Sequence, residues 1–200
     1  MHLPRHFLVT GLVASLGVAL AFVGPSPAPE QAKAADLVVD AVHSHVGFRI
    51  KHLNASWAHG RFDALAGTIH WDPAAPEKST VELTFDVGSV DTNSPDRDKH
   101  LRGSDFFDAE QFPKATFKST KIAKKGTALA VTGDFTLHGV TKSVTADVEH
   151  VGTADSPMGG EVTGFSAHLA LKRSDFGMKS VLDLIGDEVT LVVDVECGKK

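Results

Sequence analysis

The sequence predicts an all-β protein: an extended antiparallel barrel of about eight strands with one short helix near one end. Three observations support this class. From Asp36 onward, apolar residues recur at every second position, which is the period of a strand with one buried face. The connections are short and rich in turn-forming residues, so neighbouring strands are expected to pair antiparallel. One segment breaks the alternation, and it carries helix signals.

The stretch VELTFDV shows the alternation most clearly. Its apolar residues Val81, Leu83, Phe85 and Val87 point one way, and the polar residues between them point the other. The remaining expected strands share this pattern. They are an opening strand near Leu37 to Val42, strands around Val46 to Ile50, Phe62 to Trp71, Ala115 to Phe117, Val131 to Leu137, Val144 to Val148 and Phe165 to Leu171, and a C-terminal run from Val189 to Cys197.

The connections between these strands contain turn residues at Asp72–Pro76, Lys125–Gly126, His138–Gly139 and Met158–Gly160. The exception is the segment between Asp91 and Pro113. There a serine at position 94 can cap a helix, a proline follows at the first helical position, and a glycine at position 103 can end it. We therefore predict one short helix from about Pro95 to Arg102.

Strands with one apolar face must bury that face, and the mixture of inward side chains favours a barrel over two stacked sheets. Large and small residues alternate on the predicted inner face. The large ones are Phe48, Phe62, Phe85, Phe117, Phe135 and Phe165, and the small ones are Ala64, Ala66, Gly133, Ala146 and Ala167. This mixture is compatible with an apolar channel and equally with a well-packed interior.

The N-terminus resembles a signal peptide. Arg5 precedes an apolar run from Phe7 to Val23, and small residues around Lys33 form a cleavage pattern. We predict a signal peptide at residues 1–34, a barrel domain at 35–200 and a periplasmic or secreted location, with an uncleaved anchor as the alternative. Cys197 is the only cysteine, so no internal disulfide is available, and its place in an alternating run predicts a buried thiol.

Composition argues against several functions. The formal net charge is −5 and basic residues are not clustered, so we predict no nucleic-acid partner. The triplet Asp175-Phe176-Gly177 matches a kinase magnesium motif, but the glycine-rich loop, the strand lysine and the catalytic loop of kinases are missing from the sequence. No G-x-S-x-G nucleophile motif occurs either. We predict that the protein is not an enzyme and uses no cofactor.

Histidines provide an alternative. His43 and His45 are two apart on an expected strand, which would place both imidazoles on one face. With His52, His59 or His70 nearby they could bind zinc or copper, but no accompanying metal motif is present and we assign no metal ligands.

The predicted helix carries polar groups beside an aromatic pair. Arg97 and His100 could face an anionic head group while Phe106 and Phe107 cover an apolar tail. Alternatively, Asp98 and Arg102 form a surface pair and the two phenylalanines plug the barrel.

Several stretches together resemble the YceI-like family of exported polyisoprenoid-binding proteins. They are DAVHSHVGFRIKHLNASWAHGRF, DTNSPDRDKHLRGSDFFDAEQFPKATFKS, VTGDFTLHGVTKSV, LKRSDFGM and IGDEVTLVVDVE, in order over the body of the chain. The resemblance accounts for the Asp-Phe-Gly triplet as part of a turn that leaves a barrel strand, with Arg173 and Asp175 structural and Gly177 supplying the bend. The sequence departs from the family pattern at His45, Trp57 and Ser143.

The resemblance implies a lipocalin-like barrel that binds, without catalysis, a long apolar chain such as a polyisoprenoid or a quinone-like tail. The protein would then be an exported lipid carrier or store, brought near membranes by lipid exchange, and a homodimer is compatible with this role. The alternative is an exported stress-related barrel without a ligand. The predicted ligand-binding residues are Phe48, Phe62, Phe85, Arg97, His100, Phe106, Phe107, Phe117, Phe135, Phe165 and Phe176.

Overall fold

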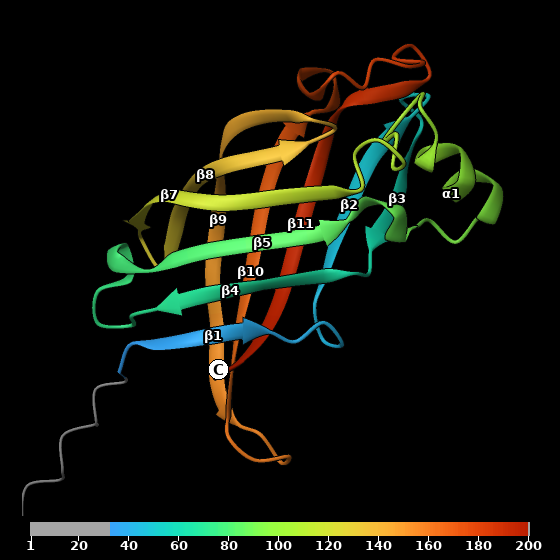
Figure 1. Ribbon diagram of the computed structural model, residues 1–200. Helices are drawn as coiled ribbons and strands as arrows, with labels where there is room; N and C mark the ends of the chain where they lie inside the picture. Colours follow the sequence, from blue (N-terminus) through green and yellow to red (C-terminus); the bar gives the residue numbers. More distant parts are fainter. Residues whose placement is uncertain (1–32, 200) are drawn as a thin grey trace, which may run out of the picture. The chain divides into compact units, whose positions relative to one another are not determined.

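The computed structural model describes residues 33–199, in which eleven strands build one antiparallel sheet (Figure 1). The strands are β1 (Ala35–Val39), β2 (His45–His52), β3 (Ser56–Phe62), β4 (Leu65–Trp71), β5 (Thr80–Asp86), β6 (Val90–Asp91), β7 (Lys114–Lys125), β8 (Ala128–Leu137), β9 (Val140–Asp155), β10 (Glu161–Lys172) and β11 (Ile185–Lys199). The helix α1 (Pro95–Arg102) and three 3-10 turns, η1 (Pro76–Lys78), η2 (Val87–Ser89) and η3 (Arg173–Phe176), lie in the connections. All but two residues of the predicted signal peptide lie outside the described residues.

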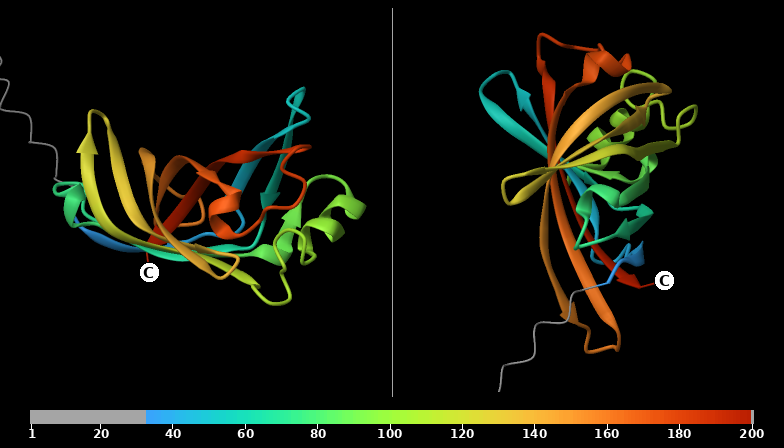
Figure 2. Two further views of the ribbon diagram at one scale, coloured as in Figure 1. Left: turned by 90° about the horizontal axis from the view of Figure 1, so that it is seen from above. Right: turned by 90° about the vertical axis from the view of Figure 1, so that its left-hand side faces the viewer.

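Eight of these strands close into a barrel, as predicted. The order is β1-β4-β5-β7-β8-β9-β10-β11, and β1 pairs with β11 to complete the ring. The strands β2, β3 and β6 extend the sheet from β11. In Figure 2, the β2–β3 hairpin (cyan) and α1 (green) lie at one end of the left view, and the β7–β8 turn (yellow) lies at the other.

One edge of β11 pairs with β10, and its other edge pairs with two strands in succession. Its C-terminal end pairs with β1, and its preceding part, from Ile185 to Asp194, pairs with β2. The predicted opening strand ends earlier than expected, at Val39, because the chain leaves the sheet over residues 40–44 before β2 begins. The strand β3 was not predicted, because most of its side chains are exposed and the partly buried positions before Phe62 hold the small residues Ala58 and Gly60.

A second break corrects the predicted inner face. The expected strand from Phe62 to Trp71 is interrupted after Phe62, and β4 begins at Leu65. The two intervening residues shift the alternation by one position, so Leu65 points inward whereas Ala64 and Ala66 are exposed. The prediction that these two alanines face the interior was wrong for this reason.

The remaining alternation follows the sequence. The inward residues of β8 are buried at every second position from Leu129 to Leu137, and Cys197 is completely buried. The β8–β9 turn is His138–Gly139, with φ angles of 51° and 72°, which suits the tight hairpin turn that matches strand twist. A Cβ atom at Gly139 would lie 2.5 Å from the ring of Phe112, so this glycine is needed for space as well as for conformation.

The helix α1 has the predicted bounds. Ser94 occupies the cap position without a side-chain capping bond, Pro95 starts the helix, and Gly103 ends it. Within residues 33–199, no helix has the length and apolar content needed to cross a membrane.

Candidate ligand-binding cavity

Apolar side chains line a narrow cavity inside the barrel, which we call the inner cavity. Its volume is about 100 Å³. The polar residue Ser79 is buried at its edge, where its hydroxyl accepts the backbone N–H of Asp72. The lining residues come from almost every barrel strand: Val46, Leu65, Ile69, Trp71, Ser79, Val81, Leu83, Phe85, Phe117, Ile122, Leu129, Val131, Phe135, Ala146, Val148, Phe165, Ala167, Leu169, Leu191, Val193 and Val195.

A larger pocket, the outer pocket, opens at the α1 end and has a volume of about 750 Å³. That volume is within the range of small-molecule sites, whereas the inner cavity is smaller than an engineered core cavity that binds benzene. The walls of the outer pocket come from α1 and its flanking segments, the β2–β3 hairpin, the segment after β10 and the barrel strands β5, β8, β10 and β11. They are Phe48, Ile50, His52, Ser56, Trp57, Ala58, His59, Phe62, Phe85, Thr92, Arg97, His100, Leu101, Phe106, Phe107, Phe135, Leu137, Leu171, Arg173, Met178, Val181, Leu184, Ile185, Val189 and Leu191.

Two phenyl rings separate these spaces. Phe85 and Phe135 line both the inner cavity and the outer pocket, together with Leu191. Their ring centroids lie 6.4 Å apart in a stacked arrangement, and Phe62 packs on Phe85 at 4.7 Å. The outer pocket and the inner cavity therefore adjoin across an aromatic partition formed by Phe85 and Phe135.

A second aromatic cluster lies at the other side of the inner cavity. Trp71 and Phe165 line that cavity with their rings edge to face at 5.1 Å, and His150 packs against both. The inner cavity thus lies between two groups of aromatic side chains.

Polar groups hold α1 beside the outer pocket. The buried carboxylate of Asp98 accepts hydrogen bonds from the backbone N–H and the hydroxyl of Thr92. The guanidinium of Arg97 donates to the hydroxyl and to the carbonyl of the same threonine, at 2.8 and 2.6 Å. Arg102 instead approaches the carbonyls of Gly88 and Val90 at 3.4 Å. The alternative surface pair between Asp98 and Arg102 is wrong, because both side chains bond to backbone or threonine groups.

Arg173 is a buried cation in the wall of the outer pocket. Its guanidinium donates to the carbonyls of Gly186, Met178 and Ile185 at 2.9 to 3.1 Å, and only 4% of the residue is exposed. Burial lowers its pKa, and the charge of Asp187 opposes that shift. Because its donors bond to Met178 in the loop after η3 and to Ile185 and Gly186 at the start of β11, Arg173 has a structural role, as the resemblance implied. Gly177 supplies the bend, with φ of 84°.

The aromatic pair after α1 faces the pocket. Phe107 packs edge to face on Phe62 at 5.3 Å, and Phe106 packs edge to face on His100 at 5.0 Å. His100 itself is exposed and lies 3.7 Å from Asp105. These rings form part of the pocket wall at the α1 end.

Ten of the eleven predicted ligand-binding residues line one of the two spaces. Phe117 and Phe165 line the inner cavity, and the others line the outer pocket or both spaces. Phe176 is the exception, because it lies buried behind Phe135, with its carbonyl accepting a bond from His138 Nδ1. Sequence reasoning missed the aliphatic walls of the later strands, although the same alternation identifies them. The alternation does not identify the loop residues Met178, Val181 and Leu184.

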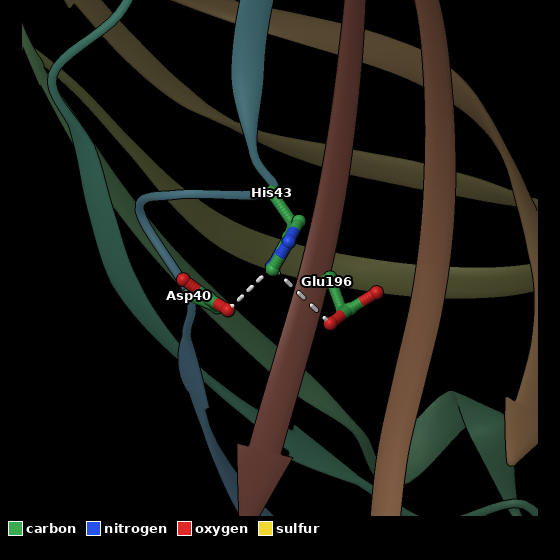
Figure 3. Close-up of side chains that lie close together, drawn as sticks. All are labelled: Asp40, His43 and Glu196. Atoms are coloured by element: carbon green, nitrogen blue, oxygen red, sulfur yellow. Dashed lines mark hydrogen bonds and ion pairs between the residues drawn. The ribbon is translucent and has the colours of Figure 1, made fainter. Parts of the chain in front are cut away.

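The histidines of the metal alternative do not converge. His43 lies in the segment between β1 and β2, not on a strand, and its Nδ1 is 2.8 Å from Asp40 and 3.6 Å from Glu196 (Figure 3). His45 instead approaches Asp194, and His70 bonds to Asp36. Among residues 33–199, Asp40, His43 and Glu196 are the one group of three potential metal ligands brought close together.

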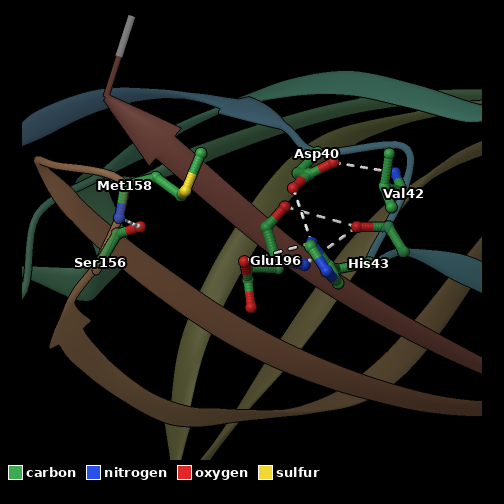
Figure 4. Close-up of polar contacts among 7 residues, drawn as sticks. Asp40, Val42, His43, Ser156, Met158 and Glu196 are labelled. Atoms are coloured by element: carbon green, nitrogen blue, oxygen red, sulfur yellow. Dashed lines mark hydrogen bonds and ion pairs between the residues drawn. The ribbon is translucent and has the colours of Figure 1, made fainter.

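This polar cluster has a structural explanation. The N–H of Asp40 donates to the carbonyl of Glu196, and Ser44 exchanges hydrogen bonds with the backbone of that same residue. The carboxylate of Asp40 also accepts the N–H of Val42 (Figure 4). The cluster therefore braces the break between β1 and β2 against β11.

A family model, a relative of similar sequence and solved structures all relate this chain to YceI-like proteins. Residues 37–197 match the model of the YceI-like domain. The chain is 44% identical over 167 residues to "Protein YceI" of Escherichia coli O157:H7, which covers 82% of this chain and 87% of that protein. The crystal structure of BcnA from Burkholderia cenocepacia matches with a TM-score of 0.71 and 29% identity, over 79% of this chain and 98% of that one. A polyisoprenoid binding domain from Saccharophagus degradans shares the fold, with a TM-score of 0.62 and 18% identity, over 84% of this chain and 100% of that one.

Proposed function

The chain belongs to the YceI-like family, and from this premise we propose that it binds a long apolar lipid, such as a polyisoprenoid or quinone-like chain, in its barrel. The observation that carries the proposal is the inner cavity, which is lined by apolar residues and adjoins a pocket open at the α1 end. A structure of the same fold is that of a polyisoprenoid binding domain, which supports this class of ligand.

The energetics favour an apolar chain over a polar ligand. Each buried methylene contributes about 0.8 kcal/mol, so a long hydrocarbon needs few polar contacts for tight binding. The polar groups of Arg97, Asp98 and Arg173 already bond to the protein. They shape the pocket and leave its apolar surface to provide most of the affinity.

The two spaces suggest how the ligand is arranged. The outer pocket, at about 750 Å³, is large enough for a head group and the first part of a chain. The inner cavity, at about 100 Å³, must widen to accept the rest. We infer that Phe85 and Phe135 rotate away from each other as the chain enters, because they form the partition.

We further propose that the protein is exported and carries or stores the lipid outside the cytoplasm. The apolar run from Phe7 to Val23 and the small residues flanking Lys33 support export. A water-soluble barrel shields a hydrocarbon from solvent, and this role requires no catalytic group.

Native mass spectrometry of the protein after mild extraction tests the proposal. We expect a co-purifying mass of several hundred daltons that organic solvent removes and that an added polyprenol restores. A bare polypeptide that takes up no polyprenol under any condition would favour the ligand-free barrel. Elemental analysis of the same sample tests the histidine-based metal-binding alternative, because a stoichiometric metal would indicate a metal-binding protein.

A further inference from the structure

Exposed apolar side chains gather at the mouth of the outer pocket. Of the nine large hydrophobic residues exposed in the described chain, five lie in the β2–β3 hairpin or in the segment before β11, and they are 41–55% exposed. We call this group the apolar rim; it consists of Leu53, Trp57, Val181, Leu182 and Leu184. The two segments are far apart in sequence, but the N–H of Leu53 donates to the carbonyl of Leu184 at 2.7 Å.

The rim continues into the pocket. Trp57, Val181 and Leu184 line the outer pocket and are also exposed to solvent. An apolar molecule leaving the pocket here therefore meets apolar side chains until it is outside the protein. In Figure 1, the cyan hairpin and the red segment that carry the rim lie together at the top.

Two residues of the rim adopt backbone conformations that have a conformational cost. Val181 has φ of 46°, a region that β-branched residues rarely adopt, and Leu53 has φ of 52°. The carbonyl of Val181 accepts the N–H groups of Leu184 and Ile185, which fixes the turn. Leu53 and Val181 are therefore held at their exposed positions in two constrained turns.

Two basic residues lie beside the rim in a protein whose net charge is negative. Arg49 and Lys51 lie in the β2–β3 hairpin beside the rim, whereas the whole chain has a formal charge of −5. The third basic residue of the hairpin, Arg61, lies next to Phe62 and pairs with Asp63 at 2.8 Å and with Asp91 at 3.6 Å. Arg49 lies 4.7 Å and Lys51 5.5 Å from the ring of Trp57. At the other segment of the rim, which runs from Val181 to Leu184, the positive charge of Lys179 is balanced by the negative charge of Asp183.

We propose that the apolar rim docks on the surface of a bilayer that contains anionic phospholipid. An exposed tryptophan and leucines beside lysine and arginine are the combination that inserts at a membrane interface. The positive hairpin favours anionic lipid over a second copy of this chain, because a two-fold contact would bring Arg49 and Lys51 against their own copies. As a route for lipid into the outer pocket, this docking rests on the proposed function.

Vesicle flotation tests the docking. The protein is purified from cells that export it, mass spectrometry records its N-terminus, and all variants share that N-terminus. We expect binding to vesicles of phosphatidylethanolamine with phosphatidylglycerol, and weaker binding to phosphatidylcholine alone. The double variant Leu53→Asp, Leu182→Asp should lose at least about tenfold in vesicle partitioning, because two charges enter the apolar rim.

A matched control uses the opposite end of the barrel. Val151 lies in β9 and is 65% exposed, and Met158 lies in the β9–β10 turn and is 93% exposed. This hairpin is orange in Figure 1, and Met158 is drawn in Figure 4. This hairpin lies at the C-terminal end of β11 and the rim at its N-terminal end, roughly 45 Å away along the strand. The variant Val151→Asp, Met158→Asp should retain vesicle binding. A second readout is a blue shift of tryptophan emission on binding, which Trp57→Phe should abolish because Trp71 is buried.

The outcomes separate docking from ligand binding. Loading with a polyprenol from detergent solution, measured by native mass spectrometry, should be unchanged in the rim variant. If the wild type binds vesicles through the rim but never loads, docking stands and the proposed function fails. The docking proposal is overturned if the wild-type protein binds no vesicles of either composition, or if the two double variants lose vesicle binding equally. It is also overturned if the rim variant only abolishes a concentration-dependent dimer.

Discussion

The rings of Phe85 and Phe135 lie 6.4 Å apart, with an angle of 30° between their planes, and both side chains line the inner cavity and the outer pocket. Their position gives the barrel an interior that is neither an open channel nor a uniformly filled core. Removal of either ring should change which ligands reach the inner cavity.

We predict that Phe135→Ala joins the two spaces and increases the uptake of longer polyprenols. The change should also destabilise the protein by about 3–5 kcal/mol, because it removes a buried ring from the core. Urea denaturation measures the loss, and native mass spectrometry with polyprenols of increasing length measures uptake. Phe48→Ala is the control, because Phe48 lines the outer pocket and not the inner cavity. An unchanged length preference in Phe135→Ala would argue against the partition.

A second prediction fills the inner cavity. Ala167→Phe places a ring in its wall and should block uptake of a polyprenol, with a stability cost of about 1–3 kcal/mol from overpacking. Ala170→Phe is the matched control, because Ala170 lies three residues later on β10 and is exposed. Circular dichroism checks that both variants fold. Normal uptake by a folded Ala167→Phe protein would contradict the location of the ligand chain.

The strands of this protein can be predicted from its sequence better than the points at which those strands are interrupted. The alternation of Val81, Leu83 and Phe85 was readable because a strand with one dry face has a strict period of two. The inward position of Leu65 could not be predicted from the pattern, because the two-residue break after Phe62 depends on pairing with distant strands. Sequence patterns predict the period of a strand much better than the point at which it leaves the sheet.

The same distinction applies to the cavity. Candidate aromatic residues could be chosen because they lie on the inner face of expected strands. The burial of Phe176 behind Phe135 depends on the turn η3, and the wall formed by Val181 and Leu184 comes from a loop without periodicity. Contacts of this kind follow from tertiary packing, so the sequence pattern alone could not reveal them.

A third prediction concerns the loop before β11, which contains Val181, Leu182 and Leu184 of the apolar rim. Arg173→Lys should destabilise the protein by about 2–4 kcal/mol, because an ammonium group cannot reproduce the fork that reaches three separate carbonyls. Hydrogen exchange should show faster exchange around Ile185, and thermal denaturation should show a lower Tm. The exposed Arg49→Lys control should change stability by less than about 0.5 kcal/mol. If the two variants are equally stable, the conclusion that Arg173 stabilises this loop is wrong.

The last prediction concerns pH. The hydrogen bond to Asp40 and the negative charges of Asp40 and Glu196 raise the pKa of His43 above 6.5, and the bond from His43 lowers the pKa of Asp40 below 3.8. The histidine's contribution to stability is therefore complete below pH 6.5 and is lost as pH rises through its folded-state pKa. The contribution of Asp40 is present above pH 3.8 and is lost as pH falls through its folded-state pKa. Both contributions are therefore present between pH 3.8 and 6.5.

NMR titration of the His43 ring tests this coupling. Asp40→Asn should return its pKa toward 6.5, and Glu196→Gln should lower it less, because the oxygen of Glu196 is 3.6 Å away whereas that of Asp40 is at 2.8 Å. Asp36→Asn is the control, since Asp36 bonds to His70 and should leave the titration of His43 unchanged. If Asp40→Asn and Asp36→Asn shift His43 equally, the shift comes from general surface charge. In that case the contact that braces the break between β1 and β2 would not be its cause.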